Sequence, residues 1–160
     1  MKYLLDTNIF IRSKNDMPFD IYLSFWNKIA QLAQSGSFYS SVKVEEEILK
    51  GNDGLTDWIR ANLPNDFFLP VDGLVLAEYA KVQIWASDNP IFTPSARNVF
   101  ANVADAFLVA TASARKMTLV TFEKSNPLCA KRVLIPDACL GIGVNCCDLN
   151  TAFKALNVTF

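Results

Sequence analysis

Four acidic positions in this sequence could work together in chemistry. They are Asp6, one glutamate of the triplet at 45–47, Asp105 and Glu123. Carboxylates that converge in a partly buried pocket repel one another and raise each other's pKa unless a cation compensates their charge. A divalent ion can lower the pKa of bound water, hold a phosphate and neutralise charge on a leaving oxygen. The acids therefore suggest metal-assisted hydrolysis of a phosphate ester.

The absence of histidine narrows this chemistry further. None of the 160 residues is a histidine, which excludes histidine-based triads, histidine general bases and the usual imidazole ligands of zinc and copper. Carboxylates alone favour hard cations in oxygen sites that retain water. We therefore expect Mg²⁺ or Mn²⁺ as the cofactor.

Length and composition indicate one domain. The chain is 51% hydrophobic and carries a formal net charge of −1, and a chain of this length can bury one sizeable core. We expect a single domain over residues 1–160. Because no global positive field attracts nucleic acid or an anionic membrane, a polyanion must be bound by a local basic patch or by metal ions.

The cysteines and the N-terminal region favour a cytoplasmic protein. The four cysteines lack the paired spacing of a structural zinc site and are expected to be free thiols; they are Cys129, Cys139, Cys146 and Cys147. The N-terminus has no basic region followed by a long apolar stretch, and no segment approaches the roughly 20 apolar residues that span a bilayer. We expect no membrane association.

Alternating apolar strands and amphipathic helices predict an α/β fold with a parallel sheet covered on both faces. Strands are expected at 2–5, 37–41, 67–71 and 117–123, and helices at 20–36, 42–51 and 104–116. The region 53–102 is predicted to be mostly helical, and 133–149 to form a strand, a short helix and another strand. A final helix is expected from about Asp148 to Leu156.

Two residues are expected to cap helices. Thr93 precedes Pro94, which fits an N-cap followed by proline in the first turn. Asp137 in the segment IPDAC is an acid before a short helix, and an N-cap role is favoured for it as well.

The predicted elements can bring the acids together. Asp6 and Glu123 each follow a strand, and ligands of an open parallel sheet bind outside the carboxyl ends of its strands. Asp105 lies in the first turn of its helix and shares a face with Leu108, Val109 and Ala112, so it points inward unless it only complements the helix N-terminus. Periodicity does not choose among the acids of 45–47, which could also form a solvated face.

Four motifs in order resemble the PIN-domain ribonucleases, especially the VapC-like toxins of bacterial toxin–antitoxin pairs. They are LLDTNIFI at 4–11, VEEEILKG at 44–51, DAFLVATASA at 105–114 and LVTFE at 119–123. The segment IPDACLGIGVNC is similar to an uncharacterised bacterial PIN-like subfamily. The resemblance implies a three-layer PIN-like fold, in which helices cover both faces of a central parallel sheet of four to five strands.

The resemblance also implies an activity and a set of residues. The chain is expected to be a metal-dependent endoribonuclease in which Asp6, Glu47, Asp105 and Glu123 hold Mg²⁺ or Mn²⁺. It places the second acid on Glu47, four residues before a glycine, and the fourth on Glu123, where the family commonly has aspartate. The longer side chain could shift or weaken a second metal position.

Neighbouring polar and basic residues are expected to support this site. Thr7 and Asn8 could hydrogen-bond and orient the carboxylates, or could only cap a local turn, and Thr121 belongs to the Val-Thr pair before the fourth acid. Basic residues near the motif ends are candidates for phosphate contacts, although scattered basic residues are usually only surface; they are Arg12, Lys14, Lys124, Lys131 and Arg132.

The resemblance implies partners and leaves alternatives. A toxin of this kind acts on RNA, is neutralised by a cognate antitoxin protein and often forms a homodimer. Because of Glu123 and the low net charge, a catalytically degenerate PIN-like module that binds RNA or a protein partner remains an alternative. A phosphatase of the haloacid dehalogenase type is less favoured, since it needs a second aspartate where Asn8 stands.

Overall fold

A five-stranded parallel sheet forms the centre of the protein. The computed structural model describes residues 1–51 and 54–160, and the expected start of the helical middle region at Asp53 lies outside them. The strand order is β3-β2-β1-β4-β5, and all neighbouring strands are parallel. The strands are β1 (Tyr3–Leu5), β2 (Phe38–Ser41), β3 (Phe68–Leu69), β4 (Thr118–Val120) and β5 (Cys146–Cys147).

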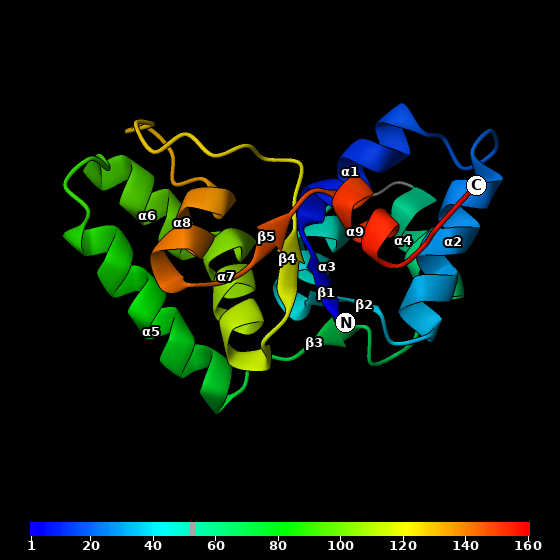
Figure 1. Cartoon of the computed structure of the whole chain (residues 1–160), viewed down its shortest axis with the longest axis horizontal. Helices are drawn as coiled ribbons and strands as arrows, with labels where there is room; N and C mark the ends of the chain where they lie inside the picture. The colour runs from blue at the N-terminus through cyan, green and yellow to red at the C-terminus, as the bar shows by residue number, and fades with distance from the viewer. Residues whose placement is uncertain (52–53) are drawn as a thin grey trace.

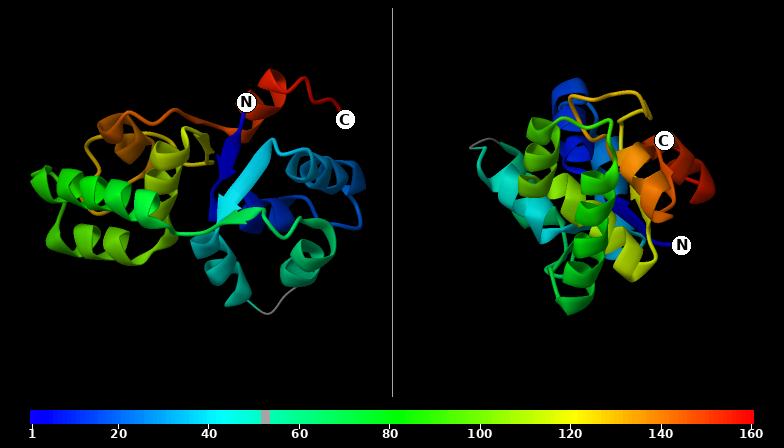
Figure 2. Two further views of the ribbon diagram at one scale, coloured as in Figure 1. Left: turned by 90° about the horizontal axis from the view of Figure 1, so that it is seen from below. Right: turned by 90° about the vertical axis from the view of Figure 1, so that its left-hand side faces the viewer.

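Helices flank this sheet on both sides. In Figures 1 and 2, α5 to α8 lie on one side and α1, α2, α4 and α9 on the other. The helices are α1 (Thr7–Asp16), α2 (Leu23–Gln34), α3 (Val42–Leu49), α4 (Gly54–Asn62), α5 (Gly73–Asp88), α6 (Pro94–Asn102), α7 (Ala104–Arg115), α8 (Ile135–Ile142) and α9 (Leu149–Ala155). The expected α/β fold with a covered parallel sheet is therefore confirmed.

Sequence pattern explains the central elements. All three residues of β1 are buried, as expected for a strand covered on both faces of a parallel sheet. In α7, alanines 104, 106, 110 and 112 are buried together with Leu108 and Val109. These small side chains allow α7 to pack closely against the sheet, which brings its first turn to the edge where β1 and β4 end.

The order of the strands creates a switch point between β1 and β4. From β1 the chain continues outward to β2 and β3, and it later returns to the other side of β1 to form β4 and β5. At such a point the connections leave the carboxyl ends of neighbouring strands in opposite directions, which opens a crevice for ligands. Asp6 and Thr121 directly follow the two strands.

Several local expectations need correction. The strand expected at 117–123 ends at Val120, so Glu123 lies in the loop that follows β4, and the segment before α8 is irregular rather than a strand. Asp137 is not an N-cap: Leu134 takes that position, and the Asp137 carboxylate accepts hydrogen bonds from the Ser125 hydroxyl and the Asn126 amide.

Two further observations concern the helices. The N-cap role of Thr93 is confirmed, because its Oγ1 accepts a hydrogen bond of 3.1 Å from the Ala96 amide. Helix α1 was not expected, since Thr7 and Asn8 were interpreted as residues that orient the carboxylates or cap a local turn. Among the described residues, no helix is long and apolar enough to cross a membrane.

Candidate functional site

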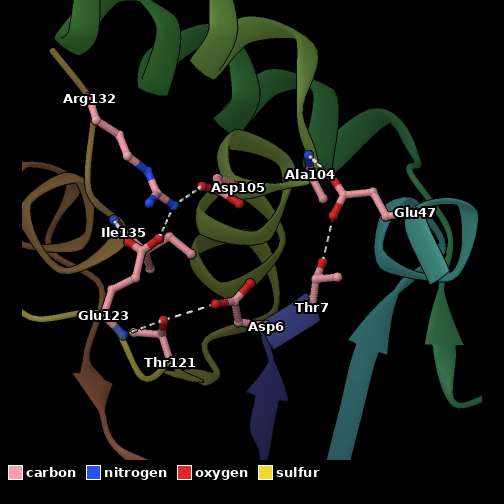
Figure 3. Close-up of polar contacts among 9 residues, drawn as sticks. All are labelled: Asp6, Thr7, Glu47, Ala104, Asp105, Thr121, Glu123, Arg132 and Ile135. Carbon is pink, nitrogen blue, oxygen red and sulfur yellow. Dashed lines mark hydrogen bonds and ion pairs between the residues drawn. The ribbon is translucent and has the colours of Figure 1, made fainter. Parts of the chain in front are cut away.

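Asp6 lies at the centre of the candidate site, at the junction of β1 and α1 (Figure 3). It is 2% exposed, and its Oδ2 accepts a hydrogen bond of 2.9 Å from Thr121 Oγ1. Burial raises the pKa of Asp6 to about 6; the Thr121 bond opposes this rise, the charge of Glu123 adds to it, and the amides of Thr7 and Asn8 also oppose it. Ionisation of the Asp6 carboxylate is therefore less favourable in the folded protein than in water.

Asp105 enters the same space from the first turn of α7. Its carboxylate points toward that of Asp6 in Figure 3, and its side chain is 17% exposed. Burial raises the pKa of Asp105 to about 7, and the charges of Asp6 and Glu123 raise it further, whereas Arg132 lowers it; Glu47 makes a smaller contribution that also raises it. The expected inward orientation is present, and the two aspartates share an excess of negative charge.

Glu47 is the acid of the triplet that reaches this site. Its Oε2 accepts a hydrogen bond of 2.8 Å from Thr7 Oγ1, and its Oε1 accepts one of 2.9 Å from the amide of Ala104. The second bond satisfies a free amide at the start of α7. Glu47 thus fixes the helix end that carries Asp105, and both of its oxygens have protein partners (Figure 3).

Like Glu47, Glu123 accepts a hydrogen bond from the first amide of a helix, in this case α8. Its Oε1 accepts a hydrogen bond from Arg132, and its Oε2 accepts one of 2.7 Å from the amide of Ile135, the first residue of α8. Thr121 Oγ1 accepts a bond of 3.1 Å from the Glu123 amide while donating to Asp6. The loop after β4 is therefore tied to both the site and α8.

Arg132 has a role that its sequence position does not indicate. Besides Glu123, its guanidinium lies 3.9 Å from Asp105 Oδ2, so one cation serves two of the acids. Sequence reasoning considered Arg132 only as one of several phosphate contacts. Its position in an irregular loop gave no periodic signal that could place it beside the acids.

Of the remaining predicted residues, Asn8 contacts Asp6 through its backbone amide. Asn8 is exposed in the first turn of α1, and Lys14 is half-buried in the same helix. The Arg12 guanidinium lies 5.0 Å from the centre of the Phe122 ring and pairs with Asp16. Lys124 is exposed in the loop after Glu123.

The donor set fits a hard divalent ion that keeps much of its water. No cluster of three or more Asp, Glu, Cys or His side chains among the described residues could hold a metal by itself. The charge of Asp6 nevertheless acts on Asp105 across the same partly buried space, and Mg²⁺ is often held by one or two carboxylates with water and substrate phosphate. Glu47 and Glu123 could become ligands only by changing hydrogen bonds that they already make.

Comparison with solved structures supports the fold. The chain is similar to a chain in the crystal structure of VapBC2 from Rickettsia felis bound to a DNA fragment from their promoter, with a TM-score of 0.53 and 20% identity over 77% of this chain and 88% of that one. This likeness confirms the PIN-like fold implied by the motifs. No curated protein matches the sequence. The family model described as a domain of unknown function, DUF4411, matches residues 3–160, and the chain belongs to this family.

Proposed function

We propose that this chain is a metal-dependent endoribonuclease that hydrolyses RNA phosphodiester bonds, with residues 1–160 acting as one domain and Mg²⁺ or Mn²⁺ as its cofactor. The observation that carries the proposal is the placement of the buried Asp6, at the end of β1, and the half-buried Asp105, in the first turn of α7, at one site, where their pKa values are raised to about 6 and about 7. A bound cation would compensate the negative charge that makes both carboxylates unfavourable to ionise, so their arrangement suits a cation site. The PIN-like fold supports the same conclusion.

The side chains of the proposed site have different roles. Asp6 and Asp105 hold the ion, which when bound supplies an activated water and compensates negative charge on the phosphate. Thr121 orients Asp6 through its hydrogen bond. Glu47 holds the first amide of α7 and so keeps Asp105 facing Asp6. Glu123 holds Arg132 beside Asp105, where the guanidinium is placed to contact a phosphate.

The proposed biological role is the toxin of a type II toxin–antitoxin pair, with a cognate antitoxin protein and a homodimer as the expected assembly. The fold shared with a chain of the VapBC2 assembly supports this role. Expression of the chain should arrest bacterial growth, and co-expression of a small open reading frame adjoining its gene should relieve the arrest. Light scattering on the purified protein tests the dimer.

Cleavage assays test the enzymatic part. Wild-type protein should cleave RNA in Mn²⁺ or Mg²⁺ but not in EDTA, and Asp6→Asn and Asp105→Asn should each abolish cleavage while circular dichroism stays unchanged. Asp88→Asn is the matched control, because this carboxylate is exposed at the end of α5. Full activity in both site variants would refute the assignment.

The second candidate is a catalytically degenerate module that binds RNA or a protein partner. It is favoured by Glu123, whose two oxygens are engaged by Arg132 and the Ile135 amide. Such a module should show no Mn²⁺ binding by calorimetry and no RNA cleavage, yet retain RNA or a partner tightly. Mn²⁺-dependent cleavage that is lost with Asp6→Asn decides against it.

A further inference from the structure

Two hollows lie beside the carboxylate site and share a boundary. The first has a volume of about 660 Å³ and is lined by Glu123, Lys124 and Asn145, among others. The second has a volume of about 460 Å³ and lies between α1, α2 and α9. Both are lined by Arg12 and Phe122. The pair therefore forms a path that begins at Glu123 and at Thr121, which donates a hydrogen bond to Asp6, and that crosses the Arg12–Phe122 contact.

Aromatic side chains dominate the second hollow. Phe25 and Phe153 are almost fully buried at its wall, with ring centres 6.2 Å apart in an edge-to-face arrangement. Tyr22 is 43% exposed, and the exposed Phe160 packs against both phenylalanines. A hollow of this size, with aromatic walls and an open side, fits a flat heterocyclic ligand such as a nucleobase.

A cation stands where the two hollows meet. The Arg12 side chain is 61% exposed, and its Nε lies 3.2 Å from Asp16 Oδ2. Because that ion pair uses Nε, and the guanidinium lies over the Phe122 ring, the terminal nitrogens of Arg12 are placed to meet an anion. A second cation, Lys124, directly follows Glu123 in the sequence and lines the first hollow. Along the path, the cations Lys124 and Arg12 therefore lie next to the aromatic surfaces of Phe122 and the second hollow.

We infer that this path is a binding groove for single-stranded RNA, in which Arg12 contacts a backbone phosphate next to the cleaved bond and the aromatic hollow takes the base beyond it. The inference rests on the proposed function for the direction of the strand, because the groove starts at Thr121 and Glu123, beside the proposed catalytic site. Single strands are bound by combining backbone cations with aromatic surfaces on which bases stack. A paired duplex cannot place a base in the hollow, so double-stranded RNA should bind more weakly.

Binding measured without metal tests the groove separately from catalysis. We expect fluorescence anisotropy in EDTA to show binding of a short, fluorescein-labelled single-stranded RNA of mixed sequence. Tyr22→Ala should raise the Kd about tenfold, the effect typical of losing one stacked base, and Arg12→Gln should raise it and flatten its salt dependence. Ile84→Ala and Lys81→Gln are controls on exposed positions of α5 and should bind as the wild type does.

The outcomes separate the groove from the nuclease. If the wild type cleaves RNA but both groove variants bind RNA normally and cleave at the same positions, the groove is refuted and the nuclease stands. If RNA binding depends on Tyr22 and Arg12 but no divalent ion supports cleavage, the groove stands and the nuclease falls. Absence of RNA binding in the wild type, or variants that lose only a protein partner, overturns the groove. Thermal unfolding checks that each variant is folded.

Discussion

Without divalent ions, the protein should become less stable as the pH rises through the range in which Asp6 and Asp105 ionise. The pKa of Asp105 is raised from 3.8 to about 7 and that of Asp6 from 3.8 to about 6. Between these values the folded state holds protons that the unfolded chain has released, so the free energy of unfolding falls with rising pH. The loss is nearly complete at about pH 8, once both groups are ionised in the folded state as well.

The size of the effect can be worked out for Asp105. A pKa that rises from 3.8 to about 7 corresponds to about 4 kcal/mol, since a tenfold change in proton affinity is worth about 1.4 kcal/mol. Asp105→Asn removes the charge at nearly constant shape. At about pH 8 this variant should therefore be more stable than the wild type by up to about 4 kcal/mol, whereas below about pH 4 the two should be similar.

Urea unfolding in EDTA at a series of pH values measures this directly. Groups whose pKa is lowered, such as Glu78 and Asp148, titrate at more acidic pH and do not obscure the window above about pH 5. Asp88→Asn serves as the control and should follow the wild type. Adding Mn²⁺ at about pH 8 should stabilise the wild type much more than Asp105→Asn. A wild-type stability that stays constant or rises between about pH 5 and about pH 8 would show that the aspartates do not carry uncompensated charge.

Other perturbations test the surroundings of the aspartates. Glu47→Ala should lower the free energy of unfolding by about 1–3 kcal/mol, measured in urea, because it leaves a buried helix amide and a hydroxyl without their acceptor. Arg132→Gln should tighten Mn²⁺ binding in calorimetry, because a competing cation is removed; unchanged affinity would contradict this. Gly141→Ala places a Cβ 2.1 Å from the Trp85 indole nitrogen and should lower the melting temperature, whereas Gly73→Ala has open space and should not.

Local patterns predicted the elements that carry the aspartates. The apolar run before Asp6 indicated a buried strand, and the helix that begins near Asp105 was evident from its apolar face; both features are encoded in short stretches of sequence. Helix α1 was missed because its buried face consists only of Thr7, Ile9, Phe10 and Ser13, next to polar residues that resemble a turn.

Long-range contacts could not be predicted in the same way. Periodicity left the acids of 45–47 equivalent, and Glu47 is distinguished by contacts with Thr7 and Ala104, which lie 40 and 57 residues away along the chain. The resemblance to PIN domains had placed the second acid there without giving its contacts. Arg132 likewise became visible only when the irregular loop after β4 was seen to return beside Glu123.

These contacts give the four acids two different physical characters. Asp6 and Asp105 are costly to ionise, whereas one oxygen of Glu47 and one of Glu123 accept hydrogen bonds from the first amides of α7 and α8, and the other two are bonded by Thr7 and Arg132. A glutamate suits the second task, since its longer side chain reaches from the loop after β4 to a helix start 12 residues further on. The glutamate at the fourth acidic position therefore has a structural reason in this chain, because it anchors α8 and holds Arg132 beside Asp105.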